Sequence, residues 1–180
     1  MAAFQQDGIV GREGDFFRLT AEGLRRLDDL GFVTDTSQVF VAMWFSSQME
    51  TAYTLGFEPA ISDNGFDALR IDKKEHINKI DDEIISEIRK SRFLVADFTC
   101  ELVKANRHLT GIPRGGVYYE AGFAQGIGIP VIWSVRSDCI DYVHFDTRQY
   151  AHIVWDDPED LRVKLRNRIG AVIGQRSAGT

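Results

Sequence analysis

The 180-residue chain is poor in cysteine and histidine, and this scarcity excludes several kinds of site. Its two cysteines, Cys100 and Cys139, form no CxxC motif and lie in no Cys/His cluster, so the sequence predicts no metal site. The same cysteine usage is typical of reduced thiols in a cytoplasmic protein, which is the location we expect. The four histidines are scattered along the chain and indicate no catalytic triad.

The chain also lacks an excess of positive charge and any long apolar run. Its net charge is −6, whereas proteins that bind nucleic acids directly usually need a basic face. No apolar segment approaches the ~18 residues of a membrane-spanning helix. The N-terminus, MAAFQQDGIVGREGDFF, has no basic region followed by an apolar stretch, as a secretory signal would. We therefore expect neither a membrane partner nor direct binding of nucleic acid.

Residues 37–180 do carry the pattern of an α/β domain. Apolar strands alternate with helices over short links, which predicts an open, mostly parallel five-stranded sheet with helices on both faces, Rossmann-like or flavodoxin-like. The polar stretch over 100–116 is expected to be a loop. The expected strands are 39–43, 66–71, 93–98, 129–135 and 153–155, and the expected helices are 48–63 (with a kink or end at Pro59), 73–90, 117–126 and 158–173.

Residues 1–36 have a different pattern. Phe16-Phe17-Arg18-Leu19 predicts a short strand, and Thr20 is a suitable N-cap for a helix that carries leucines at helical spacing and ends at Gly31. A strand followed by such a helix resembles the last part of a winged-helix domain. We interpret this segment as a winged-helix-like remnant or a linker.

Two acidic residues stand where ligands bind in open α/β sheets, at the carboxyl ends of the strands. Asp97 ends an apolar strand, and Glu120 follows the Gly115–Gly116 turn that opens a helix. The helix N-terminus would favour an ionised Glu120, and ionised carboxylates attack or stabilise the anomeric carbon in glycosidases. Alternatively, Glu120 is only a favourable charge near the start of a helix, and Asp97 caps the following loop.

Further candidate ligand-binding residues are expected near the same edge of the predicted sheet. Arg114, with the amides of Gly115 and Gly116, would suit a phosphate group, although a lone loop arginine is commonly just solvated. Asp81 and Asp82 interrupt the stripe of isoleucines on the helix predicted over 73–90. Asp81 borders this stripe, so it could reach the ligand site and supply or accept a proton. Alternatively, the two aspartates belong to a solvated face of the helix. Aromatic rings able to contact a nucleobase, or simply to fill the core, are Trp44, Phe45 and Tyr118.

Residues 39–135 resemble the nucleoside 2-deoxyribosyltransferase family. The shared residues are Val41-Ala42-Met43-Trp44-Phe45, Ala52-Tyr53 and Gly116-Val-Tyr-Tyr-Glu120-Ala-Gly122-Phe-Ala124. The resemblance implies that Glu120 is the nucleophile and that Asp81 or Asp82 is the nearest counterpart of the family's helix aspartate. Arg114 stands where many members carry an aspartate, which argues against classical deoxyribosyl transfer.

A second resemblance is to TIR domains, some of which cleave NAD with a glutamate. It rests on residues 84–95 and on Phe145-Asp-Thr-Arg-Gln-Tyr150 before Ile153-Val-Trp155. The leading hypothesis is cleavage or transfer at an N-glycosidic bond of a nucleoside or nucleotide. In it Glu120 reacts, Asp97 and Asp81 orient the sugar or protonate the base, and no cofactor is needed. The alternatives are TIR-type cleavage with NAD as substrate, and a non-catalytic nucleotide-sensing or interaction module. We also expect a homo-oligomer.

Overall fold

The computed structural model describes residues 10–13, 16–20, 36–73, 80–105 and 108–175. The chain divides into two compact units, residues 1–33 and 34–180. In the first unit, β1 (Val10–Glu13) pairs antiparallel with β2 (Phe16–Leu19). The strand over 16–19 was predicted, whereas its partner β1 was not. The leucine helix predicted after Thr20 lies outside the described residues.

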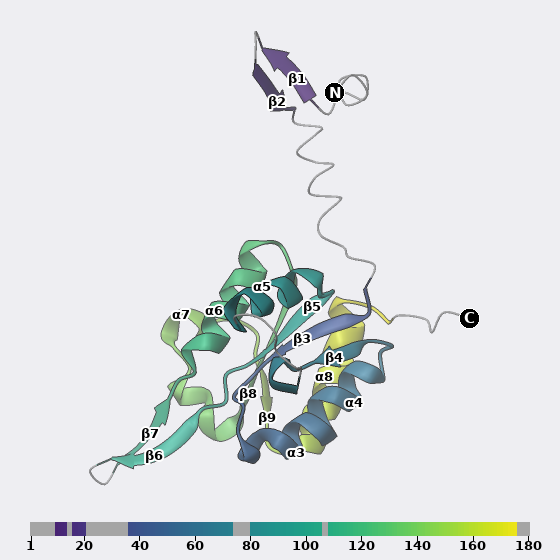
Figure 1. Ribbon diagram of the computed structural model, residues 1–180. Helices are drawn as coiled ribbons and strands as arrows, with labels where there is room; N and C mark the ends of the chain where they lie inside the picture. Colours follow the sequence, from purple (N-terminus) through teal and green to yellow (C-terminus); the bar gives the residue numbers. More distant parts are fainter. Residues whose placement is uncertain (1–9, 14–15, 21–35, 74–79, 106–107, 176–180) are drawn as a thin grey trace. The chain divides into compact units, whose positions relative to one another are not determined.

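The second unit is built on a five-stranded, all-parallel sheet in the order β4-β3-β5-β8-β9. The predicted α/β class is therefore confirmed (Figure 1). All five residues of β5 are buried, as expected for a central strand covered on both faces. The strands are β3 (Gln38–Ala42), β4 (Asp67–Leu69), β5 (Phe93–Asp97), β8 (Val131–Arg136) and β9 (Ile153–Trp155).

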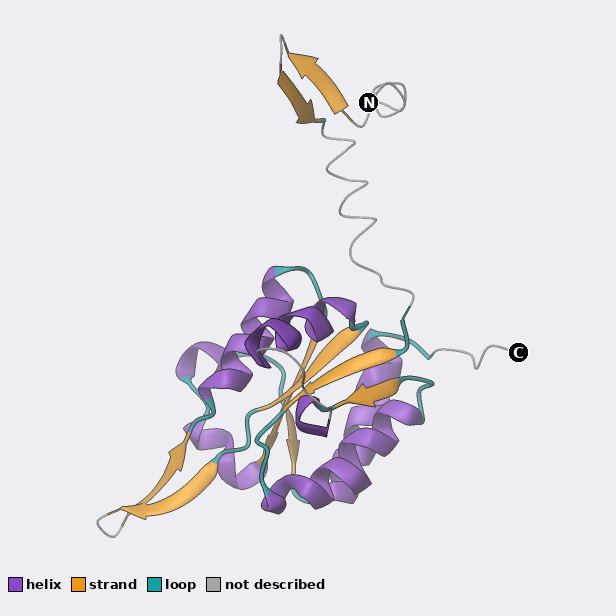
Figure 2. Cartoon of the chain, in the orientation of Figure 1, coloured by secondary structure: helices purple, strands orange, loops and turns teal. Residues whose placement is uncertain are grey.

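Helices cover both faces of this sheet (Figure 2). On one face, α3 (Glu50–Ala52), α4 (Glu58–Ser62) and α8 (Pro158–Val172) pack against alternate strand residues such as Val39 and Val95. On the other, α5 (Ile80–Lys90) and α6 (Gly115–Gly126) pack against Phe40 and Ala96. The period-two alternation of each strand thus supplies two hydrophobic clusters.

The helical run after β3 contains a π-helical turn. It begins as η1 (Ser47–Met49) and α3, passes through η2 (Tyr53–Phe57) and continues as α4. Pro59, expected to kink or end the helix, lies in the first turn of α4, where its missing N–H is tolerated. The run stays continuous, and Gly56 packs directly on Leu161 of α8.

The prediction of a polar loop over residues 100–116 is wrong. The chain forms an antiparallel hairpin of β6 (Glu101–Ala105) and β7 (His108–Ile112) that extends away from the sheet (Figure 1). The residues of β7 are mostly exposed. Its sequence therefore lacks the alternation of apolar and polar residues that marks a half-buried strand. Two further elements were not predicted, η4 (Ser137–Tyr142) and α7 (Phe145–Arg148). In the described part of the chain, no helix has the length and apolar character needed to cross a membrane.

Candidate functional site

The order of the strands locates the candidate site. The chain leaves β3 to form β4 on one side of it and later places β5 on its other side. The strand order therefore reverses at β3 and β5, and ligands of open α/β sheets bind beside the carboxyl ends of the strands at such a point. Trp44 and Phe45 follow β3, Asp97 ends β5, and Arg114 directly precedes α6.

Glu120 is a buried carboxyl in α6. Only 8% of its surface is exposed, and within the described part of the chain it has no hydrogen-bond or ion-pair partner. Burial raises the pKa of Glu120 to about 7. The expectation that the helix N-terminus holds this side chain ionised is therefore not met. Glu120 is the sixth residue of α6, beyond the first turn where the helix dipole acts, and desolvation dominates there.

Arg114 links three segments at the same edge of the sheet. Its guanidinium carbon lies 4.4 Å from the centroid of the Trp44 ring, and Nη2 donates a 2.9 Å hydrogen bond to Oε2 of Glu101 in β6. The Nε atom of Arg114 is buried and has no hydrogen-bond partner among the described residues. The guanidinium is thus oriented by an aromatic ring while part of its donor fork stays unused.

Gly115 and Gly116 open α6 on an uncrowded surface. Apart from the adjacent residues and the backbone of α6 itself, no described atom lies within 4 Å of the Cβ position at either glycine. No side chain caps this helix end, and no acidic residue lies in its first turn. Within the described residues, the Val117 amide donates to the Arg114 carbonyl at 3.0 Å, so the amides that remain available to an acceptor are those of Gly115 and Gly116.

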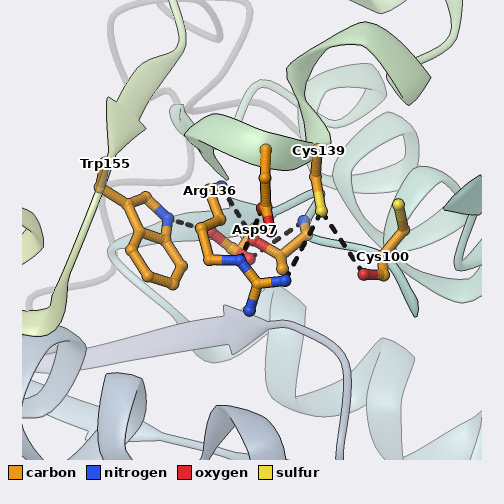
Figure 3. A network of polar contacts seen from close by, with 7 residues as sticks. Asp97, Cys100, Arg136, Cys139 and Trp155 are labelled. Atoms are coloured by element: carbon orange, nitrogen blue, oxygen red, sulfur yellow. Dashed lines mark hydrogen bonds and ion pairs between the residues drawn. The ribbon is translucent and has the colours of Figure 1, made fainter. Parts of the chain in front are cut away.

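Asp97 is fully buried and has three hydrogen-bond donors around its carboxylate (Figure 3). Oδ2 accepts from Ser134 Oγ at 2.8 Å and from Trp155 Nε1 at 2.9 Å, while Oδ1 accepts from the Thr99 amide at 3.1 Å. Asp97 lies on the sheet face that carries Val95 and α8, whereas α6 packs on the other face. The structure does not bring Asp97 into contact with Glu120. It gives Asp97 the role of joining β5, β8 and β9.

The network continues from Asp97 to the two free cysteines (Figure 3). The Arg136 amide donates to Thr99 Oγ1, and the Cys139 thiol donates to the Cys100 carbonyl. Burial raises the pKa of Cys139 to about 12, so this thiol stays protonated and unreactive. Both cysteines therefore belong to the packed interior beside the sheet edge.

The remaining predicted residues are dispersed. The Tyr118 hydroxyl accepts a 3.0 Å hydrogen bond from the His144 amide, and its ring packs edge-on against Phe98, so this side chain fixes α7 to α6. Phe45 is exposed. Asp82 is exposed on α5, while the side chain of Asp81, also in α5, lies outside the described residues.

The sequence reasoning did not identify a charged cluster centred on Arg70. This side chain is only 6% exposed, binds Asp72 through Nε at 2.7 Å and Nη2 at 2.9 Å, and pairs with Glu50 at 2.8 Å. Its guanidinium carbon lies 4.5 Å from the centroid of the Tyr53 ring. Burial raises the pKa of Tyr53 to about 12. The signal in the sequence was an arginine directly after a strand, with an acid two residues later.

Comparison with known proteins adds no assignment: no family model matches the chain, and no curated protein matches its sequence. The structure itself defines an open parallel α/β domain. Around the start of α6 it carries an arginine close to the Trp44 ring and a diglycine without a side-chain cap, and a buried carboxyl follows one turn later in the same helix.

Proposed function

We propose that this protein cleaves or transfers the N-glycosidic bond of a nucleoside or nucleotide, with Glu120 as the reacting carboxyl. The observation that carries the proposal is a carboxyl that is almost fully buried and has no protein partner within the described residues. Such a group is costly to the fold, because a buried polar group is normally hydrogen-bonded. Carboxyls with raised pKa values are concentrated at functional sites.

A pKa near neutrality suits either role of a carboxyl at a sugar–base bond. In its ionised form Glu120 attacks the anomeric carbon or stabilises the oxocarbenium ion. The carbon–nitrogen bond breaks, and its electron pair leaves with the base. Water or a second base then takes the sugar. In its protonated form, the same group would instead donate its proton to the departing base.

Other residues would support this reaction in different ways. Phe45, which is exposed, would contact the base, since aromatic faces stack on nucleobases, while the Trp44 ring carries Arg114. Asp97 would act indirectly, because its carboxylate is occupied by Ser134 and Trp155 and it keeps the strand ends together. Asp81 remains the candidate for a second acid that protonates the base.

The test is chromatography for free base after incubation with a panel of nucleosides, nucleotides and NAD. We expect base release by the unaltered protein and its loss in Glu120→Gln, which keeps the shape of the side chain but cannot ionise. Glu159→Gln, at an exposed site in α8, is the matched control and should retain turnover. Undiminished release by Glu120→Gln would remove Glu120 from the chemistry. Nicotinamide release from NAD alone would favour the TIR-type alternative.

A second candidate is a nucleotide-sensing module without turnover. It is favoured by one observation: burial alone accounts for the pKa of Glu120, with no contribution from a neighbouring charge. Most glycosidases use two carboxyls, and the described residues show no second one acting on Glu120. Nucleotide binding that is lost in Glu120→Gln, without base release under any condition, would support this module.

A further inference from the structure

Arg114 is held in a way that leaves it ready to exchange its acidic partner. Its ion pair with Glu101 lies near the surface, with 31% of Arg114 and 43% of Glu101 exposed. Exposed ion pairs of this kind contribute little to stability, because water screens them. On the basis of the proposed function, we propose that the substrate is a nucleoside 5′-monophosphate whose phosphate replaces Glu101 on Arg114.

The guanidinium of Arg114 can donate more hydrogen bonds to a phosphate than it donates to Glu101. Glu101 receives a hydrogen bond from Nη2, whereas the buried Nε has no partner. A phosphate presents several acceptor oxygens and matches the planar fork of an arginine with two parallel hydrogen bonds. The Trp44 ring, 4.4 Å from the guanidinium carbon, already holds the plane of the fork, so little ordering is required on binding.

The start of α6 adds neutral donors beside Arg114. The helix has 12 residues, no capping side chain and no first-turn acid, and the space over Gly115 and Gly116 is open. Amide groups and a partial positive charge at such a helix end favour a phosphate. Because either glycine replaced by a larger residue would cover these amides, the diglycine keeps the backbone accessible.

A second observation ties this helix end to Glu120. Helical side chains lean toward the N-terminus, so we expect the Glu120 side chain to lean toward the turn that contains Gly116. Four residues, a rise of ~6 Å along the helix, separate the Cα atoms of the two residues. Glu120 is more than nine-tenths buried and has no partner among the described residues, so its carboxyl is free to contact a ligand bound at this helix end.

This arrangement discriminates between substrates by charge. An uncharged nucleoside leaves Arg114 bound to Glu101 and gains nothing from the helix end. A 5′-monophosphate displaces Glu101 and places the anomeric carbon beside Glu120, while Arg114 offsets the charge of the phosphate next to that carboxyl. Glu101 therefore acts as a competitor carried by the β6–β7 hairpin.

The binding experiment measures thermal stabilisation by inorganic phosphate and by a nucleoside 5′-monophosphate, which does not depend on turnover. We expect both to stabilise the unaltered protein and Glu120→Gln, and neither to stabilise Arg114→Gln. Glu101→Gln should bind both up to about fivefold more tightly, the factor that corresponds to an exposed ion pair of up to about 1 kcal/mol. Lys104→Gln, an exposed change on the same strand, is the control and should match the unaltered protein.

The kinetic experiment compares one nucleoside with its 5′-monophosphate. We expect a kcat/KM at least tenfold higher for the monophosphate, competitive inhibition by inorganic phosphate, and a collapse of the preference in Arg114→Gln. Equal turnover of the two compounds, or phosphate binding that is unchanged in both Arg114→Gln and Glu101→Gln, would overturn the inference. Glu120-dependent release of base from nucleosides would in that case still support the proposed function. Phosphate binding through Arg114 without any base release would refute the function and leave the phosphate site in place.

Discussion

The indole nitrogen of Trp155, on the edge strand β9, donates a 2.9 Å hydrogen bond to Oδ2 of Asp97, at the end of the central strand β5. The strand between them, β8, adds the hydroxyl of Ser134 to the same oxygen at 2.8 Å. One carboxylate thus joins three parallel strands at the edge where the candidate site lies. This relationship assigns Asp97 to the framework of the site.

We expect Asp97→Ala to destabilise the fold by about 3 kcal/mol or more, because a buried donor without its acceptor costs about 1–3 kcal/mol and two side-chain donors lose theirs. Urea denaturation measures the change in the free energy of unfolding. Asp141→Asn, at an exposed position, is the control and should stay within about 0.5 kcal/mol. If Asp97→Ala lowers the free energy of unfolding no more than the control does, the hydrogen bonds that join the three strands contribute little to stability.

The contribution of Glu120 to the stability of the protein should fall as the pH rises from about 4.5 to about 7. The pKa of Glu120 is raised from 4.5 to about 7, so the folded state holds a proton that the unfolded state releases in this range. The penalty is absent below pH 4.5 and complete above about 7, where it amounts to about 3 kcal/mol. Denaturant titrations at several pH values should therefore show Glu120→Gln more stable than the unaltered protein at pH 8 and equal to it at pH 4. The same stability difference at both pH values would contradict the raised pKa.

Two glycine-to-alanine changes should have opposite effects. A methyl group at Gly56 would lie 2.7 Å from Cδ2 of Leu161 and 3.1 Å from the Pro158 carbonyl, so the buried Leu161 side chain must move and the start of α8 must yield by a few tenths of an ångström, at a cost of about 1–3 kcal/mol. Gly122, within α6, has no atom within 4 Å of that position. Gly122→Ala should stabilise the fold by up to about 1 kcal/mol, the difference in helix propensity. Thermal unfolding compares them; a neutral Gly56→Ala would mean that the π-helical turn and α8 move apart easily.

Arg70→Lys should be more damaging than the same change at Arg162. Both arginines hold an aspartate with two nitrogens, but Arg70 is buried and also pairs with Glu50, whereas Arg162 pairs with Asp63 at the surface. Lysine keeps the charge and loses the planar fork. We expect a loss of about 1–3 kcal/mol at Arg70 and less than about 1 kcal/mol at Arg162, measured by urea denaturation. Equal losses would mean that burial adds nothing to the Arg70 cluster.

Much of the fold follows from local patterns. The continuous apolar runs at β3 and β5 predicted strands buried on both faces, and both strands have that burial. The β6–β7 hairpin escaped prediction because its stability comes from cross-strand pairing between residues 101–105 and 108–112, while exposed side chains give no periodic signal. The π-helical turn before Pro59 was also missed, since the pattern of apolar residues does not distinguish one turn of π-helix from α-helix.

The candidate site likewise has features that could be predicted from the sequence and features that depend on the folded structure. The diglycine before α6 and the position of Glu120 in that helix could be read from the chain, because glycine turns and helix starts are local features. The ionisation of Glu120, the attachment of Arg114 to Glu101 and Trp44, and the engagement of Asp97 by Ser134 and Trp155 depend on residues that only folding brings together. Sequence alone determined the five strands of the parallel sheet, the main helices that cover it and which acids stand near the strand ends, since those follow from apolar runs and turn residues. Tertiary structure decided which of these acids is satisfied and which is left buried without a partner, because desolvation and hydrogen bonding depend on neighbours far away along the chain.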